Sequence, residues 1–445
     1  MAGETFRPST FAALIQESVL EIGDGYRAKN EELGGTGPLF LRAGHVTDSH
    51  IDFEGVERFH AELAPRLEAK MSKPGDTIIT TKGNSTGRTS FVTEAMPRFV
   101  YSPHLSYWRS KSPTQLANGF LRYWSQGSEF ALQLAAMKAS TDMAPYLSLT
   151  DQRRLRITLP PLVEQQAIAC VLGALDDKIE LNRRRNRTLE AMARAIFRSW
   201  FVDFDPVRAK AAGRAPAGLA KEVAALFPAA FEDGPVGPIP KGWRWRPLPD
   251  VCEVNPTRTL SKGTPAPYLD MANMPTQGPS AEAWVMREMG SGMKFRNGDT
   301  LVARITPCLE NGKSAFVDFL ADGQVGWGST EYIVLRPKAM IPPVFAYLLA
   351  RTEDFRTFAI QQMTGSSGRQ RVPADSLGKY SLASPELDAP LFVRFGQFVA
   401  PLFARMTAAV EQSRTLAAMR DALLPKLISG ELRVADAERI VGRAT

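Results

Sequence analysis

The segment ENGKSAFV, residues 310–317, raises the question of nucleotide hydrolysis, because Gly312, Lys313 and Ser314 resemble the end of a phosphate-binding loop. Such a loop needs a glycine five positions before the Gly-Lys-Ser, so that backbone N–H groups can curl around the phosphates. That position is Pro307, which has no N–H. The residues after Ser314 favour a strand, where a phosphate-binding loop would open a helix. The sequence therefore argues against an ATPase.

Two further catalytic motifs also fail on their context. GNSTG at residues 83–87 matches the G-x-S-x-G nucleophile elbow, which requires a helix after the serine. The sequence RTSFV follows instead and predicts a strand, so we expect a hairpin tip there. An adenine methyltransferase would need Asn or Asp followed by Pro-Pro and an aromatic residue, and neither FDPV at Phe204 nor VNPT at Val254 qualifies. We expect no catalytic residue and no cofactor.

Histidine and cysteine give no metal site. His45, His50 and His60 share a segment, yet they lack cysteine neighbours and the H-x-x-x-H spacing of a helical zinc site, so we interpret them as surface residues. The three cysteines are too far apart for a disulfide framework or a metal knuckle. The N-terminus has no signal-peptide pattern, and no apolar run approaches the roughly eighteen residues that span a membrane. We expect a cytoplasmic protein that does not contact membranes.

The segment around Lys313 has a second copy in the chain. GDTIITTKGNSTGRTSFV begins at Gly75 and GDTLVARITPCLENGKSAFV begins at Gly298, and both predict strand, polar loop and strand. RTLEAM at Arg187 parallels RTLAAM at Arg414 with nearly the same offset. The 445 residues therefore contain two copies of one unit, each running from a β-rich region into a helix.

Each copy ends in a predicted long helix. The segment from Leu159 to Phe201 has prolines only at its start, and its apolar positions alternate steps of three and four, which is the spacing of a coiled coil. It would span roughly 55 Å. In the second copy Pro401 and Pro425 leave the bounds of the helix open. The predicted seam positions are Ile168, Leu172, Leu175, Ile179, Asn182, Asn186, Leu189 and Ile196 in the first helix, and Phe395, Leu402, Met406, Leu416 and Leu423 in the second.

Polar residues occupy the centre of both seams. A buried amide such as that of Asn182 or Asn186 can fix helix register at some cost in stability, whereas a position on the wet side of the seam would have no such role. Two copies of one unit pack most simply around a pseudo-two-fold axis, which makes the helices antiparallel. The predicted fold is α+β, with two globular domains separated by a long antiparallel two-helix coiled coil and an internal pseudo-two-fold repeat. The net charge of +7 is compatible with a polyanionic partner.

The helical blocks carry a family resemblance. Residues 159–210 resemble the central helical region of specificity subunits from type I restriction-modification systems, and residues 402–432 resemble their C-terminal helical region. With GWRWRPL at Gly242 and NGDTLVARI at Asn297, the similarity covers nearly the whole chain.

The resemblance implies a non-catalytic chain that recognises a bipartite double-stranded DNA site. It also implies a scaffold on which methyltransferase (modification) subunits and a restriction (motor and nuclease) subunit assemble, with the helices acting as a ruler for the gap between half-sites. The segment between the first helix and the second globular region is rich in Ala, Pro and Gly, which predicts a linker with one short helix. The expected boundaries are 1–158 for the first target recognition domain, 159–202 for the central helical region, 203–240 for the linker, 241–384 for the second target recognition domain, 385–432 for the C-terminal helical region and 433–445 for a tail.

Polar loops between the paired strands would then face DNA. Arg and Lys bind phosphates and guanine, and Asn pairs with adenine, although any of these side chains can equally be a solvated turn residue. The loop from Thr364 adds two arginines, which its counterpart from Lys138 lacks. The candidate DNA-binding residues are Lys82, Ser85, Thr86, Arg88, Arg304, Asn311, Lys313, Arg369 and Arg371.

Two rival functions share parts of this pattern. A stand-alone sequence-specific DNA-binding regulator would use the same basic loops, yet it would not need so long a pair of helices. A purely structural coiled-coil adaptor would leave the duplicated globular domains without a role, and it would show no salt-dependent affinity for DNA.

Overall fold

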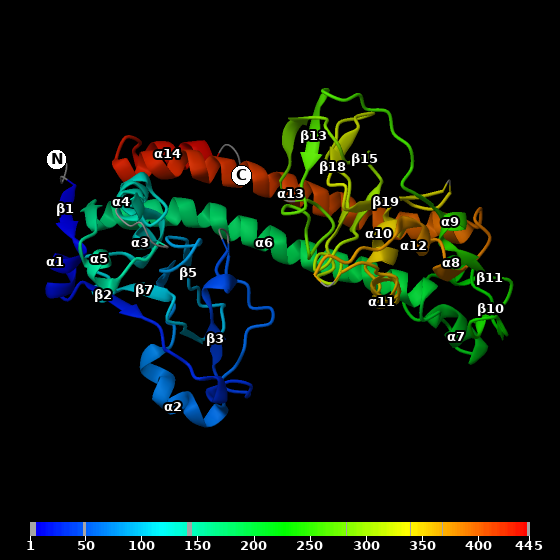
Figure 1. Ribbon diagram of the computed structural model, residues 1–445, viewed down its shortest axis with the longest axis horizontal. Helices are drawn as coiled ribbons and strands as arrows, with labels where there is room; N and C mark the ends of the chain where they lie inside the picture. The colour runs from blue at the N-terminus through cyan, green and yellow to red at the C-terminus, as the bar shows by residue number, and fades with distance from the viewer. Residues whose placement is uncertain are drawn as a thin grey trace. The chain divides into compact units, whose positions relative to one another are not determined.

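The computed structural model describes residues 6–47, 50–139, 145–281, 283–338, 340–366 and 368–442. The chain divides into two compact units, the first made of residues 1–178 with 415–445 and the second of residues 179–414. Two long helices, α6 (Leu162–Phe201) and α13 (Pro390–Ser429), contribute residues to both units (Figure 1).

The long helices are continuous over 40 residues each, which corresponds to about 60 Å. Helix α13 runs through Pro401 and Pro425, the two residues that left its bounds open in the sequence. Within the second unit the two helices are antiparallel, because Asn182 bonds to Gln412 whereas Asn186, one turn later, bonds to the carbonyl of Met406.

The globular part of the first unit is built on an antiparallel sheet with the strand order β2-β7-β4-β5. A parallel pair β3–β6 and an antiparallel pair β1–β8 accompany it. Its strands are β1 (Arg7–Thr10), β2 (Leu20–Asp24), β3 (Leu39–Leu41), β4 (Thr77–Thr80), β5 (Thr89–Phe91), β6 (Phe99–Tyr101), β7 (Leu105–Ser110) and β8 (Arg156–Leu159).

The second unit repeats this topology with the strand order β12-β19-β16-β17. A second sheet, β14-β13-β18-β15, contains the parallel pair β13–β18, and β11 pairs with β20. Its strands are β11 (Arg244–Pro247), β12 (Cys252–Val254), β13 (Pro265–Leu269), β14 (Val285–Glu288), β15 (Met293–Phe295), β16 (Thr300–Ala303), β17 (Ser314–Phe316), β18 (Gly326–Gly328), β19 (Tyr332–Pro337) and β20 (Ser381–Ser384).

Strand register shows the duplication at the level of single residues. Thr77, at the start of β4, faces Phe91 on β5, and the equivalent Thr300 on β16 faces Phe316 on β17. The predicted strand, loop and strand are therefore confirmed in both halves. A stretch with this pattern cannot be a phosphate-binding loop, because Ser314 begins a strand instead of a helix.

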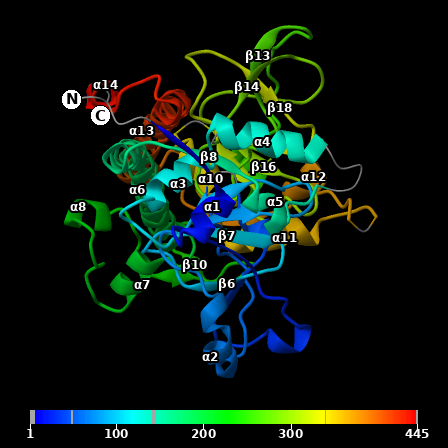
Figure 2. The same ribbon diagram turned by 90° about the vertical axis from the view of Figure 1, so that its left-hand side faces the viewer.

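Short helices lie between and after the sheet strands in both units. In the first unit α3 packs on α6 so closely that a Cβ on Gly119 would lie 2.7 Å from the Cβ of Ala169 (Figure 2). These helices are α1 (Phe11–Gln16), α2 (Ala64–Leu67), α3 (Asn118–Trp124), α4 (Ser128–Ala139) and α5 (Leu149–Arg153), then α9 (Leu248–Val251), α10 (Val344–Ala350), α11 (Glu353–Gln361) and α12 (Ala374–Leu377). Short 3-10 turns lie at Asn30–Glu32, Ala43–His45, Ala61–Leu63 and Glu68–Lys70.

The segment 203–240 contains two helices where the sequence predicted one, α7 (Asp205–Ala211) and α8 (Lys221–Ala224), followed by the hairpin of β9 (Phe231–Glu232) and β10 (Ile239–Pro240). Apolar residues spaced through its Ala- and Pro-rich sequence explain the difference. Phe204, Val207, Val223, Phe227 and Ile239 are all buried in the core of the second unit. The C-terminal segment forms α14 (Val434–Gly442), with Ala437 buried.

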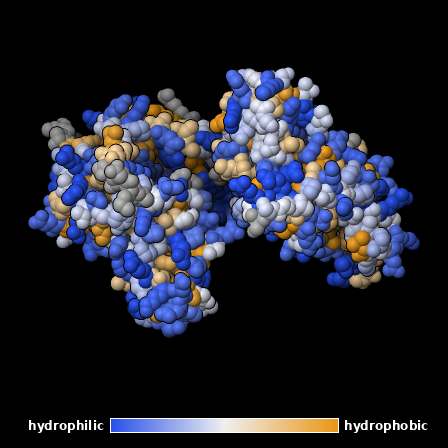
Figure 3. All heavy atoms as spheres, in the orientation of Figure 1, coloured by the Kyte–Doolittle hydropathy of each residue, from blue (hydrophilic) through white to orange (hydrophobic). Residues whose placement is uncertain are grey.

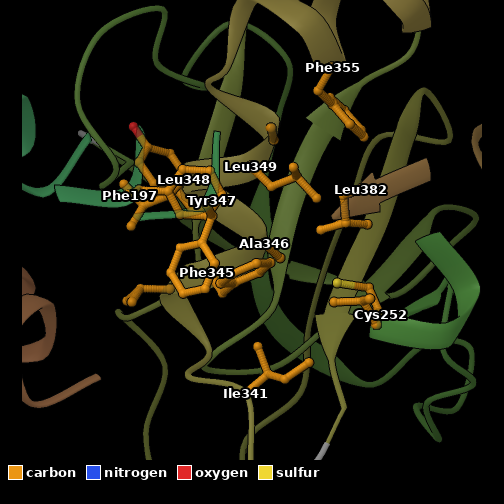
Figure 4. Packing of buried hydrophobic residues seen from close by; sticks show 14 of the residues in the cluster. Phe197, Cys252, Ile341, Phe345, Ala346, Tyr347, Leu348, Leu349, Phe355 and Leu382 are labelled. Carbon is orange, nitrogen blue, oxygen red and sulfur yellow. The ribbon is translucent and has the colours of Figure 1, made fainter. Parts of the chain in front are cut away.

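The core of the second unit is rich in aromatic side chains. Phe197 of α6 and Phe345 of α10 meet at a ring distance of 5.0 Å, and Figure 4 shows Tyr347 beside them. On the face drawn in Figure 3 hydrophilic residues predominate, with apolar residues in small separate groups. Over the residues that the structure describes, no helix is both long and apolar enough to cross a membrane.

Candidate nucleic-acid interface

The hairpin tip between β4 and β5 is joined to the segment that precedes α5. We call residues 81–88 and 145–147 the first loop pair. The amide of Leu147 donates to the carbonyl of Thr81 at 2.9 Å, and the amide of Gly83 donates to Pro145 at 3.2 Å. Thr86, 3% exposed, also donates its hydroxyl to Pro145, at 3.0 Å. These bonds hold two polar segments side by side although they are far apart in the sequence.

The second unit contains an equivalent arrangement. We call residues 304–313 and 364–372 the second loop pair, apart from residue 367, which lies outside the described residues. The amide of Val372 donates to the carbonyl of Arg304 at 2.9 Å, which matches the bond between Leu147 and Thr81. The amide of Thr306 donates to Gln370 at 3.0 Å. The structure therefore brings Arg304, Arg369 and Arg371, predicted from two separate segments, into one site.

The candidate residues of the first loop pair differ in what their side chains can reach. Lys82 is exposed, whereas Ser85 and Arg88 are half-buried. Arg88 donates from Nη1 to the carbonyl of Val46 at 2.9 Å, and Thr86 also donates to Gly83 at 2.7 Å. Thr86 thus closes the hairpin, and Lys82 is the most exposed side chain of this set. The counterpart loop from Lys138 lies outside the described residues at 140–144.

Two cations of the second loop pair are held by the protein itself. Lys313 donates from Nζ to the carbonyl of Met271 at 2.6 Å. Arg371 forms a fork with Glu331, with Nε–Oε1 and Nη2–Oε1 distances of 2.8 Å. The hydrogen bond to Glu331 raises the pKa of Arg371. Both side chains therefore have a structural role.

The remaining candidate residues of the second loop pair are Arg304, Arg369 and Asn311. The backbone of Arg304, directly after β16, is fixed by two bonds. Its amide donates to the backbone carbonyl of Glu331 at 3.0 Å, and its carbonyl accepts from the amide of Val372. Its Nε is buried with no hydrogen-bond partner in the described residues. Arg369 and Asn311 are exposed on the loops. The site thus combines one arginine with a fixed backbone and two exposed polar side chains.

Two further arginines reach this site from helices, and the sequence analysis did not identify them. Arg351, which follows α10, donates from Nη1 to the carbonyl of Gly312 at 2.8 Å. A Cβ on Gly312 would lie 3.3 Å from Nη1 of Arg356 on α11. Nothing in the local sequence of either residue points to the loop, because the contact depends on how α10 and α11 pack against it.

The predicted seam positions fall on the inner faces of α6 and α13. Asn182 is 3% exposed and donates from Nδ2 to Gln412 at 2.9 Å and to Ser413 at 3.2 Å. Asn186, Ile196 and Leu402 are half-buried. The other predicted positions are buried, namely Ile168, Leu172, Leu175, Ile179, Leu189, Phe395, Met406, Leu416 and Leu423.

In the part of the chain that the structure describes, no three His, Cys, Asp or Glu side chains gather as metal ligands would. What the two loop pairs offer is hydrogen-bond donors and positive charge on paired loops. Such groups bind phosphate oxygens and base edges.

Comparisons with known proteins show similarity to one family. Residues 19–191 match the family described as type I restriction modification DNA specificity domain. The chain is 23% identical over 447 residues to the type I restriction enzyme HindI specificity subunit of Haemophilus influenzae, covering 88% of this chain and 94% of that protein. It is 26% identical to the MjaIX specificity subunit of Methanocaldococcus jannaschii over 65% of this chain and 63% of that protein. The crystal structure of the type I restriction-modification S subunit from M. genitalium has the same fold, with a TM-score of 0.53, 14% identity, and coverage of 96% of this chain and 97% of that one.

Proposed function

We propose that this chain, which belongs to the specificity subunits of type I restriction-modification systems, recognises one two-part double-stranded DNA sequence on behalf of partner subunits that carry out the chemistry. The equivalence of the two loop pairs carries this proposal. The same backbone bond joins Leu147 to Thr81 and Val372 to Arg304, yet the side chains at these positions differ. One scaffold therefore presents two different sets of donors, as reading two different half-sites requires.

The residues at the two loop pairs support assigning DNA recognition to this chain and catalysis to its partners. Their donors bind and discriminate, and none of the candidate side chains forms a nucleophile with an adjacent base. We therefore assign methylation and cleavage to separate methyltransferase and restriction subunits. We place the protein in the cytoplasm, since Cys170, Cys252 and Cys308 are all free thiols.

The domain boundaries follow the same reasoning. Residues 1–158 and 241–384 would each read one half-site, and α6 with α13 would set the gap between them. The two helices are antiparallel in the second unit, where Asn182 and Asn186 of α6 bond to Gln412 and to the carbonyl of Met406 on α13. These amides would fix which turns of the helices meet.

Mapping methyladenine across the host genome tests the proposal. The map is recorded with this gene intact and deleted, while the partner methyltransferase genes remain expressed. Loss of methylation at one split motif in the deletion strain is the expected result. An unchanged map would contradict the proposal and would favour a stand-alone DNA-binding regulator.

A further inference from the structure

Helix α6 carries a buried carboxylate that holds the second globular region. Glu190 is 5% exposed, and three groups from that region surround it. The hydroxyl of Tyr347 on α10 donates to Oε1 at 2.7 Å, the amide of Gly278 donates to Oε2 at 3.0 Å, and Nε of Arg351 lies 3.4 Å from Oε1. Burial raises the pKa of the Tyr347 hydroxyl well above its ordinary value, so it remains a neutral donor. Both carboxylate oxygens are thus occupied by groups outside α6.

Arg351 extends this contact to the second loop pair. While its Nε faces Glu190, its Nη1 donates to the carbonyl of Thr276 at 2.9 Å and to that of Gly312 at 2.8 Å. The side chain is 12% exposed, and its bond to Gly312 is partly buried. One guanidinium therefore connects the long helix, the 275–279 segment and the tip of the 304–313 hairpin.

We infer that Glu190 and Arg351 are positioning residues, which fix the 304–313 hairpin against α6 so that Arg304 and Asn311 meet DNA in one geometry. This inference rests on the proposed function and names the device that makes one half of the site selective. A planar guanidinium suits the task because its donors point in fixed, divergent directions. Lysine would keep the charge opposite Glu190, yet its single ammonium cannot reproduce the fork.

The first unit has a comparable carboxylate with different contacts. Asp176 of α6 accepts from the hydroxyl of Tyr123 at 2.8 Å and from Arg420 at 2.8 Å, and it pairs with Arg122. Arg122 lies over the ring of Phe91 on β5, 5.1 Å from its centroid. In both units a carboxylate of α6 therefore bonds to the globular part of that unit, while the direct bond from the arginine to a loop-tip carbonyl is found in the second. A defect at Arg351 should accordingly affect one half-site.

The experiment uses full-length chains assembled with their methyltransferase subunits. Arg351→Met keeps the length of the stem and removes the fork, Arg351→Lys keeps the charge, and Glu190→Gln weakens the acceptor. Glu180→Gln is the matched control, because Glu180 lies on the same helix but pairs with the exposed Arg184 and Arg187. Each complex methylates a DNA library in which one half-site at a time is randomised, and hydrogen exchange is followed for the amides of residues 304–313.

Arg351→Met should reduce base discrimination roughly tenfold at one half-site and leave the other unchanged. Exchange in residues 304–313 should become faster. Arg351→Lys and Glu190→Gln should give smaller losses of discrimination at the same half-site. If thermal unfolding shows that Arg351→Met is not folded, these two variants test the inference in its place. Glu180→Gln should match the wild type.

Equal loss at both half-sites would overturn the inference, as would unchanged discrimination together with unchanged exchange. If the wild-type complex methylates the library without sequence preference, the proposed function fails. In that case faster exchange of the hairpin in Arg351→Met would still support the positioning role, and unchanged exchange would refute it.

Discussion

Asp76 and Arg109 form a two-pronged ion pair in the interior of the first unit, with Nε–Oδ1 at 2.6 Å and Nη2–Oδ2 at 2.7 Å. Asp76 is fully buried and also accepts from the hydroxyl of Tyr101 at 2.6 Å. Asp299, its equivalent in the second unit, pairs with Arg336 at 2.7 Å. The aspartate of the repeated Gly-Asp-Thr is therefore a structural residue that ties the turn before one strand to the neighbouring strand.

We expect Asp76→Asn to lower the free energy of unfolding of the first unit by about 3–5 kcal/mol, because it removes the fully buried charge that both prongs of the Arg109 guanidinium meet and leaves Arg109 with the more exposed Glu21, at 3.2 Å, as a charged partner. Urea denaturation of the whole chain measures this loss. Glu57→Gln is the control, since the pair of Glu57 with Arg42 is about half exposed, and its loss should cost about 1 kcal/mol or less. Equal effects of the two substitutions would show that the buried Asp76 pair contributes no more to stability than the exposed Glu57 pair.

Arg304→Ala should weaken DNA binding by about 1–3 kcal/mol at sites with the preferred base and much less at sites that already carry a different base there. The reason is that the backbone of Arg304 is fixed at the end of β16 and its Nε is buried, which restricts the directions from which its guanidinium can approach a base. Binding curves for a set of single-base variants of the site measure the difference. Lys241→Ala, an exposed cation in the same unit, should have no position-dependent effect. A uniform loss across all DNA variants would identify Arg304 as a phosphate contact instead.

The repeat made much of the fold predictable. Gly75 and Gly298 begin matching segments, and the alternation after them predicts the two strands that the structure shows in identical register. Heptad spacing likewise predicts the helices, since it depends only on residues close in sequence. The structure of segment 203–240 was harder to predict from the sequence. Its few apolar residues are buried, but their spacing follows neither a helical nor a strand period.

The candidate site was predictable only in outline. Polarity marks the loops, but it does not tell a side chain that faces solvent from one that closes a turn, as Thr86 does. Lys313 and Arg371 are engaged by groups far away in the sequence, at Met271 and Glu331. Arg351 reaches the hairpin tip only because α10 packs against it, and no local pattern encodes that contact.

Asn182→Leu should leave the chain as stable as the wild type, or more stable, and should relax its choice of gap length. The amide donates to Gln412, which is exposed, and to Ser413, whose hydroxyl already donates to the Ala409 carbonyl at 2.8 Å. Its removal therefore leaves little unsatisfied polarity, while the register preference of a buried amide is lost.

Thermal unfolding and methylation of sites with the gap changed by one base pair measure these two effects. Thr188→Ala, on the exposed face of the same helix, is the control and should change neither. An Asn182→Leu variant that still methylates a single gap length would show that other seam contacts set the register.

Asp318 should make the second unit less stable as pH rises. Its carboxylate lies against α13, where it accepts from Thr407 at 2.6 Å and from Ser280 at 3.0 Å, and burial raises its pKa above the ordinary value of 3.8. Between the unfolded and the raised folded pKa the folded chain binds more protons than the unfolded chain, so the free energy of unfolding falls as pH increases through that window.

Asp318→Asn keeps an oxygen acceptor and removes the titration. Its stability should decline less than that of the wild type as pH rises from about 4. Urea unfolding over this range measures the slope, with the exposed Asp322→Asn as control. If the slope of Asp318→Asn equals that of the wild type, burial of this carboxylate does not contribute to the pH dependence.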